Sequence, residues 1–324
     1  MSRHDRLLEH VKPQVRANVE EILYDGRKVT GVKVRKGTTD MVYDISAPVV
    51  VSSVGIRNTF KRLLPEEVAA RSYFGKIPDE VGPSFATACA FLGFDATTEE
   101  LELPSGNIWA FSKDDCGECI RSEFMDLERG EALQAAKTLP MAFVASPSAK
   151  DPNWRAHPGR ENKSALTVIT GASYDWFTQF EGTTLHRRGD KYEEIKSRLG
   201  DAMVELACDL FPRIRHHIDY AEFSTPLTNN FYLGAQLGET YGMEHNMKRF
   251  TDPWFAAKLR PKTDVPGLFL AGQDVISVGV MSSFAASVMT ASAVLGRNLW
   301  IDLVALHLKI AWQIRGRSIL GDME

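Results

Sequence analysis

The residues best suited to chemistry lie in the segment Pro266-Gly-Leu-Phe-Leu-Ala-Gly-Gln-Asp274 and around Gly279. A short apolar strand is predicted at Leu268–Ala271, and a helix rich in small residues is predicted from about Val280 to Gly296. The start of a helix offers free N–H groups and partial positive charge to a diphosphate, and glycines allow close backbone approach. Asp274 is placed to accept hydrogen bonds from sugar hydroxyls. The pattern therefore predicts either a nucleotide phosphate site or an ordinary strand-to-helix connection.

Two segments near the N-terminus would help to position such a site. Residues 19–45 read as a three-stranded meander, with Asp25-Gly26 at the first hairpin turn. The run Pro48–Val54 is apolar without alternation and ends at Gly55, which is typical of a buried parallel strand.

The middle of the chain, residues 66–261, mixes strand and helix patterns. Strands are predicted at 85–94, 107–112, 141–145, 165–171 and 217–223, and 146–160 reads as a loop. Residues 190–211 are predicted to form an amphipathic helix, because Tyr192, Ile195, Leu199 and Met203 recur at three- and four-residue steps. Pro212 ends that pattern.

Composition excludes several classes of protein. The chain has 324 residues, 44% hydrophobic and 25% charged, with a net charge of -4, so no polybasic case for nucleic acid exists. Cys116 and Cys119 have CxxC spacing, but no second pair supports zinc, and we predict no metal site. No signal peptide and no membrane-spanning helix are predicted.

Four strings carry a family resemblance. They are Val49–Gly55 with Asn58-Thr59, Phe143–Trp154, Thr225–Tyr232 with Gly238–Gly242, and Gly267–Asn298. Together they resemble FAD-dependent oxidoreductases of the phytoene desaturase type. Gly-Gln-Asp at 272–274 is similar to the branch of all-trans-retinol 13,14-reductase (retinol saturase) and carotenoid isomerase, matched here by its C-terminal part.

This resemblance implies bound FAD and hydrogen transfer to, or isomerisation of, a carbon–carbon double bond of a retinoid or carotenoid. NAD(P)H is implied as an upstream electron donor. The implied cofactor-binding residues are Gly272, Gln273, Asp274, Gly279, Val280, Met281, Val19, Val54 and Gly55. No catalytic acid or base is identified, because the cofactor does the chemistry and the protein orients an apolar substrate.

The sequence departs from the family in one respect. It contains no GxGxxG, so we expect the first βαβ unit to be missing, as in a truncated chain or fragment. The expected fold class is α/β: a partial, discontinuous Rossmann-like FAD domain and a mixed-sheet α+β substrate domain. The expected domains are 1–62 with 262–300 for FAD, 63–261 for substrate, and 301–324 as a C-terminal amphipathic helix or tail.

Aromatic residues of the middle region are candidates for an apolar pocket, or for ordinary core. They are Phe85, Phe91, Phe94, Trp109, Phe111, Trp176, Phe177, Phe231 and Tyr232. Asn229, Asn230 and Tyr241, with Phe231 and Tyr232, are the candidate substrate residues. The alternative for the two asparagines is turn chemistry.

The C-terminal stretch has two interpretations. Leu299, Leu303, Leu306, Ile310 and Ile314 share one helical face, which suits either a helix on a membrane surface or packing onto the FAD domain. The oligomeric state stays open, and so does the location, with the periphery of endoplasmic reticulum or plastid membranes implied by the family. Two rival functions also stay open: a flavin amine oxidase or desaturase relative, and a non-catalytic isoprenoid-binding protein without flavin.

Overall fold

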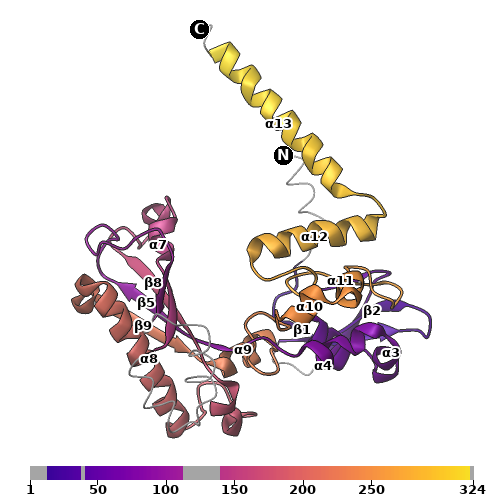
Figure 1. The fold of residues 1–324 in the computed structure, drawn as a ribbon, viewed down its shortest axis with the longest axis horizontal. Helices are drawn as coiled ribbons and strands as arrows, with labels where there is room; N and C mark the ends of the chain where they lie inside the picture. The colour runs from indigo at the N-terminus through magenta and orange to yellow at the C-terminus, as the bar shows by residue number, and fades with distance from the viewer. Residues whose placement is uncertain (1–12, 38–40, 112–138, 322–324) are drawn as a thin grey trace. The chain divides into compact units, whose positions relative to one another are not determined.

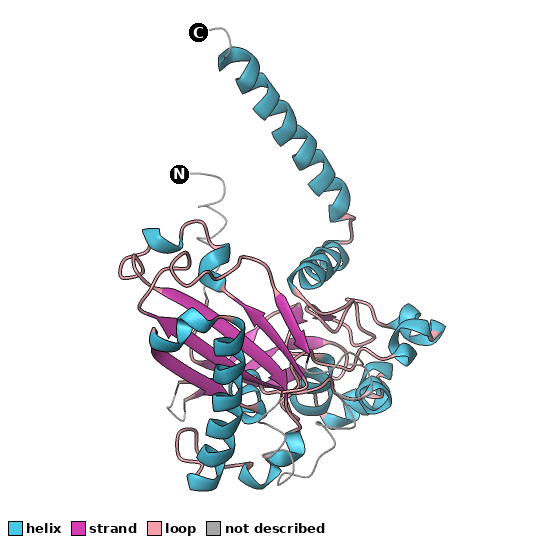
Figure 2. Ribbon diagram, turned by 60° about the vertical axis from the view of Figure 1, so that its left-hand side comes forward, coloured by secondary structure: helices cyan, strands magenta, loops and turns pink. Residues whose placement is uncertain are grey.

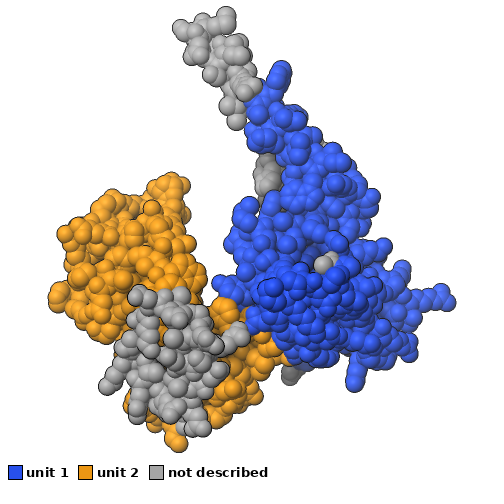
Figure 3. Space-filling view, viewed as in Figure 1, with its two compact units in different colours: residues 1–82, 241–324 blue, residues 83–240 orange. Residues whose placement is uncertain are grey.

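The computed structural model describes residues 13–37, 41–111 and 139–321. The chain forms two compact units, shown in different colours in Figure 3. Unit 1 comprises residues 1–82 and 241–324, and unit 2 comprises residues 83–240. Compared with the predicted boundaries, residues 63–82 and 241–261 join the unit that contains the predicted FAD domain. The reason is a shared core, described below.

Unit 1 begins with the meander that the sequence predicts. Strands β1 (Ala17–Tyr24), β2 (Val29–Lys36) and β3 (Val42–Ser46) form an antiparallel sheet in that order. The first turn is closed by Asp25, whose Oδ1 accepts hydrogen bonds from the N–H groups of Arg27 and Lys28, each at 2.9 Å. The Asp-Gly signal therefore acts through both its carboxylate and its glycine, Gly26, at φ 91°.

A second, parallel sheet in unit 1 pairs β4 (Val50–Ser52) with β10 (Leu268–Leu270). Helix α12 (Val280–Leu295) packs on β10, because the Thr290 hydroxyl donates to the Leu270 carbonyl at 2.7 Å. Helix α13 (Leu299–Gly321) follows it (Figure 1). Parallel strands followed by helices are the part of a Rossmann-like arrangement that the described residues contain.

Short helices complete unit 1 around one apolar core. They are α2 (Ile56–Asn58), η1 (Thr59–Leu63), α3 (Glu66–Arg71), η2 (Tyr73–Gly75), α4 (Ile77–Val81), α10 (Met247–Thr251) and α11 (Pro253–Lys258). Phe60 and Phe74 stack in this core with ring centroids 5.3 Å apart, and Phe255 is buried in it too. These rings join residues 63–82 and 241–261 to the strands of unit 1, which explains the position of the boundaries.

Unit 2 is built on a five-stranded sheet in the order β6-β7-β8-β5-β9. The strands are β5 (Thr87–Phe94), β6 (Ile108–Phe111), β7 (Met141–Ala145), β8 (Ser164–Gly171) and β9 (Ile218–Ser224). All the pairings between neighbouring strands of this sheet are antiparallel. Strands β8 and β9 run the same way, but β5 lies between them in a split βαβ arrangement.

Helix α8 (Asp190–Leu210) lies across one face of this sheet (Figures 1 and 2). Tyr192, Ile195, Leu199 and Met203 are buried against the strands, as their spacing predicts. The other helices of unit 2 are short: α7 (Pro147–Lys150), η4 (Trp154–Ala156), η5 (Tyr174–Trp176), η6 (Thr178–Phe180), η7 (Pro212–His216) and α9 (Pro226–Leu233).

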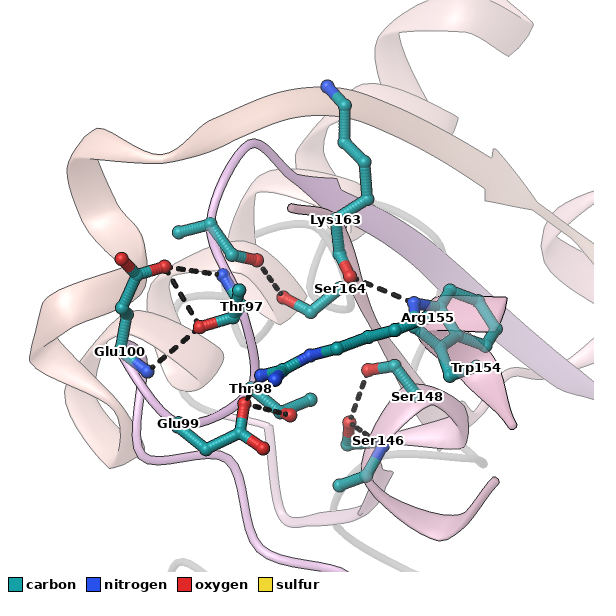
Figure 4. Close-up of polar contacts among 12 residues, drawn as sticks. Thr97, Thr98, Glu99, Glu100, Ser146, Ser148, Trp154, Arg155, Lys163 and Ser164 are labelled. Carbon is teal, nitrogen blue, oxygen red and sulfur yellow. Dashed lines mark hydrogen bonds and ion pairs between the residues drawn. The ribbon is translucent and has the colours of Figure 1, made fainter. Parts of the chain in front are cut away.

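The segment 143–154, one of the four matched strings, stabilises the loops beside β8 (Figure 4). The Ser146 hydroxyl accepts from the Ala149 N–H and so caps α7, and the Ser148 hydroxyl accepts from the Ala165 N–H at 3.0 Å. The Trp154 indole donates to the Lys163 carbonyl at 2.8 Å. This string is therefore explained by local structure.

Candidate functional site

The carboxyl ends of β4 and β10 bring together most of the predicted cofactor residues. The Ala271 N–H donates to the Ser52 carbonyl at 2.9 Å, which sets residues 52–55 beside residues 271–274. Val54, Gly55, Gly272, Gln273 and Asp274 therefore lie at one edge of the parallel sheet. This is the position at which open α/β sheets bind ligands.

Glycine conformation shapes this edge. Gly55 and Gly272 have φ of 89°, and Gly279, directly before α12, has φ of 92°. Non-glycine residues rarely adopt such angles. A side chain at Gly279 would meet no atom within 4 Å, so the space around it is open.

The N-terminus of α12 is exposed and carries no side-chain cap. Val280 and Met281 are 84% and 76% exposed. The first turn contains no acidic residue, so the partial positive charge of the helix start is not offset there. An exposed, uncapped helix start of this kind can accept an anionic ligand.

Asp274, the predicted acceptor for sugar hydroxyls, is a buried residue in this structure. It is only 2% exposed. Its Oδ2 accepts from the Ile56 N–H at 2.8 Å, and its Oδ1 accepts from the Met243 N–H at 3.0 Å. Both carboxylate oxygens thus bind main-chain groups of the protein itself.

Arg249 lies beneath the same turn and is also 2% exposed. Its guanidinium donates to the main-chain carbonyls of Met243 at 3.2 Å, Gln273 at 3.2 Å and Asp274 at 3.0 Å. Its Nε is buried without a partner. No motif in the sequence singles out this residue.

His245 contacts Arg249 through Nε2, 3.3 Å from Nη1. Because the arginine donates, the neutral imidazole must accept there and carry its proton on Nδ1. Burial and the neighbouring guanidinium lower the pKa of His245, and the Asp274 and Glu244 carboxylates oppose this effect.

Of the remaining predicted cofactor residues, Val19 lies away from the sheet edge, whereas Gln273 lies at it. Val19, in β1, pairs with Val34 and packs against the core of unit 1. The Gln273 main-chain carbonyl accepts from Arg249, as described above. Neither observation assigns a cofactor contact to these side chains.

The candidate substrate residues divide between the units. Asn229 and Asn230 lie on α9, and their amides donate to the carbonyls of Gly238 at 3.1 Å and Ala235 at 3.0 Å. These contacts agree with turn chemistry. Phe231 and Tyr232 are exposed, whereas Tyr241 belongs to unit 1.

The second face of the unit 2 sheet, opposite α8, is rich in aromatic and apolar side chains. We call it the open sheet face, defined by Phe91, Trp109, Phe111, Phe143 and Ile169. Phe91, Trp109 and Phe111 are 43%, 57% and 46% exposed, and the Trp109 and Phe143 rings lie 5.1 Å apart. Phe94, Trp176 and Phe177 are instead buried core residues.

The metal and membrane predictions can be compared with the structure only over the residues that it describes. Cys116 and Cys119 lie outside the described residues. Within residues 13–37, 41–111 and 139–321, no group of His, Cys, Asp and Glu could hold a metal ion. Among the helices that the structure describes, none combines the length and apolar character needed to cross a bilayer.

Together, the two units define an α/β protein with a Rossmann-like strand–turn–helix edge and a separate α+β sheet unit. The chain is similar to part of proteins named all-trans-retinol 13,14-reductase. It is 33% identical over 298 residues to the "All-trans-retinol 13,14-reductase" of Danio rerio, covering 91% of this chain and 47% of that protein. It is 32% identical over 300 residues to the Homo sapiens protein of the same name, covering 92% and 48%.

A further relative carries a different description. The "Inactive all-trans-retinol 13,14-reductase" of Danio rerio is 31% identical over 301 residues, covering 92% of this chain and 48% of that protein. The chain thus spans about half the length of the curated relatives it matches. No family model matches the sequence.

Solved structures resemble the chain only distantly. An oxidoreductase from Methanosarcina mazei has 17% identity and a TM-score of 0.39, covering 79% of this chain and 43% of that one. A geranylgeranyl bacteriochlorophyll reductase-like protein from Thermoplasma acidophilum has 12% identity and a TM-score of 0.35, covering 86% and 49%.

Proposed function

We propose that this chain acts in an FAD-dependent oxidoreductase that reduces or isomerises a carbon–carbon double bond of a retinoid or carotenoid. One observation carries the proposal: about nine-tenths of the chain aligns with proteins named all-trans-retinol 13,14-reductase. The sheet edge at Gly55 and Gly272 adds a structural argument, because it suits a dinucleotide.

The residues present fit FAD through their backbone. Gly272 and Gly279 leave space that a Cβ would begin to fill, and the uncapped start of α12 offers N–H groups to a diphosphate. Asp274 contributes differently, because its oxygens already accept main-chain hydrogen bonds. We therefore propose that the cofactor is held by main-chain groups and helix polarity more than by this carboxylate.

Bound FAD would supply the hydrogen transfer that side chains alone cannot perform. The protein's own part would be to hold an apolar substrate and to exclude water. We assign no catalytic acid or base.

Two glycines on opposite ends of α12 give a matched test of cofactor binding. Gly279 and Gly296 both have positive φ, and both have open space where a Cβ would lie. If the helix start binds FAD, Gly279→Ala lowers FAD affinity about tenfold, the scale of one lost charge-assisted contact, and Gly296→Ala does not. Flavin fluorescence titration measures both. Equal affinities for the two variants and the wild type would count against the site.

The substrate class is tested by turnover. The purified protein, reconstituted with FAD, is expected to convert a retinoid or a carotenoid under reducing conditions, with products identified by chromatography. Conversion of amines but of neither polyene would favour the flavin amine oxidase alternative.

We also propose NAD(P)H as the electron donor. This proposal predicts that the flavin absorbance bleaches under anaerobic conditions when NAD(P)H is added.

A second candidate function is non-catalytic isoprenoid binding. The relative named as an inactive reductase, 31% identical to this chain, favours it. This candidate predicts quenching of tryptophan fluorescence by retinol in a protein that takes up no flavin. Flavin uptake with turnover would exclude it.

A further inference from the structure

Three separate segments of unit 1 meet at the side chain of Asp274. Its carboxylate binds the N–H of Ile56, at the start of α2, and the N–H of Met243, in the loop before α10. The residue itself belongs to the turn after β10. One buried carboxylate thus connects the segments that follow β4 and β10, where we propose that flavin binds, to the loop before α10.

Arg249 closes the same arrangement from the other side. It reaches the Met243 carbonyl, so Met243 is held at its N–H by Asp274 and at its carbonyl by Arg249. It also donates to the carbonyls of Gln273 and Asp274, which fixes the turn itself. A planar guanidinium suits this task, because its donors point in fixed directions.

Gly242 makes room for this contact. A Cβ there would collide with Oδ1 of Asp274, and the residue has φ of 67°. Both features require glycine next to Met243. The string Gly238–Gly242, which the proposed function leaves unexplained, therefore ends in a residue that serves the Asp274 carboxylate.

We propose that Arg249 is a positioning residue for the flavin site: with Asp274 and Gly242 it fixes the backbone after β4 and β10 in one arrangement before the cofactor binds. The proposal rests on the proposed function. The benefit is preorganisation, since a turn that is already ordered loses less conformational entropy on binding. Without Arg249, the carbonyls of Gln273 and Asp274 lose their buried donor.

The test compares arginines from the two units. Arg249→Met is expected to weaken FAD binding about tenfold or more, because several hydrogen bonds from a charged donor are lost. Arg249→Lys is expected to restore part of this affinity. The matched control is Arg188→Met in unit 2, where a buried arginine likewise donates to a backbone carbonyl, that of Leu227. It should leave FAD affinity unchanged.

Amide hydrogen exchange of the flavin-free protein gives a second readout. Faster exchange at Ile56 and Met243 in Arg249→Met and in Gly242→Ala, with wild-type exchange in Arg188→Met, supports the proposal. Gly242→Ala and Arg249→Lys keep the test decisive if Arg249→Met does not fold. Wild-type FAD affinity in both Arg249 variants overturns the positioning role alone. A wild-type protein that binds no FAD overturns the proposed function, and the exchange rates then decide separately whether the backbone is held as described.

Discussion

At the scale of single residues, type and spacing located the edge of the sheet but not the contacts of each side chain. Asp274 is predicted just beyond a short strand, and it lies in the turn after β10. Its carboxylate turns inward because two N–H groups, of Ile56 and Met243, would otherwise be buried without a partner. Met243 is 31 positions away in sequence. A hydrogen bond between residues this far apart leaves no pattern in the local sequence. The contacts of Arg249 are also not local, so the sequence does not single it out.

His245 predicts a dependence of stability on pH. Its pKa is lowered in the folded state by burial and by Arg249, so the unfolded state binds more protons below the ordinary value of 6.5. The free energy of unfolding should therefore fall as pH decreases from about 6.5 toward the folded-state pKa. The charged and titratable groups that face this ring are Arg249, Asp274 and Glu244.

Urea unfolding of the wild type and of His245→Gln between pH 5 and 8 measures this effect, since glutamine keeps an acceptor but does not titrate. The variant is expected to lose less stability than the wild type over the acid part of this range. Parallel curves for the two proteins would show that His245 does not contribute.

At the scale of elements, periodic patterns in the sequence predicted the helices and strands whose formation depends on local interactions. The helix predicted at 190–211 is observed as α8, and the predicted strands of unit 2 are present. We predict no helix over residues 225–232 from the sequence, whereas Pro226–Leu233 form helix α9. Its signal was a capping box between Thr225 and Thr228, with Pro226 at the first helical position. Strand pairing across the sheet could not be predicted, because it depends on contacts distant in sequence.

Helix α8 lies close to strand β9 at Gly200. A Cβ there would overlap the ring of Phe223 on β9. Alanine at this position gains about 1 kcal/mol in helix propensity, but overpacking costs about 1–3 kcal/mol. We expect Gly200→Ala to destabilise the protein, and Phe223→Leu to reduce that loss when combined with it.

A double-mutant cycle by urea unfolding measures the coupling between these two positions. The double variant should be more stable than the sum of the single changes predicts. Additive changes would mean that the ring moves aside without strain.

On helix α13 the predicted stripe is exposed at Leu306 and Ile310, which are 52% and 44% exposed, and a second apolar stripe lies on the opposite side. Ile301, Val304, Leu308 and Trp312 recur at three- and four-residue steps and are 67%, 59%, 63% and 77% exposed. We propose that this stripe contacts the surface of a membrane. The charge change Val304→Glu with Leu308→Glu should then reduce flotation with vesicles of phosphatidylcholine and phosphatidylserine at least several-fold, since each buried apolar side chain contributes about 1.5–3 kcal/mol.

The control adds the same charge on polar, exposed positions of the same helix, His307→Glu with Gln313→Glu. Flotation that falls equally in both pairs would reflect charge alone. Wild-type flotation after the first pair would exclude this stripe as a membrane contact.

At the scale of the whole molecule, two cores that share no residue define two units. The unit 2 core comes entirely from residues 88–227, and the unit 1 core combines residues 22–81 with 243–286. The predicted boundaries followed a change in sequence character near 62 and 262. The structural boundaries follow the aromatic cluster of Phe60, Phe74 and Phe255, whose members come from distant parts of the chain. Composition along the sequence cannot reveal which distant aromatics share a core.

Separate cores predict separate loss of protection when each is damaged. Phe74 in unit 1 and Phe177 in unit 2 are both 0% exposed, so Phe74→Ala and Phe177→Ala are matched changes, each expected to cost about 3–5 kcal/mol. Hydrogen exchange by mass spectrometry should show faster exchange in β1, β2 and β10 for the first variant and in β5, β7 and β8 for the second. If either change accelerates exchange equally in both sets of strands, the two cores unfold as one cooperative structure, and the division into units does not describe its energetics.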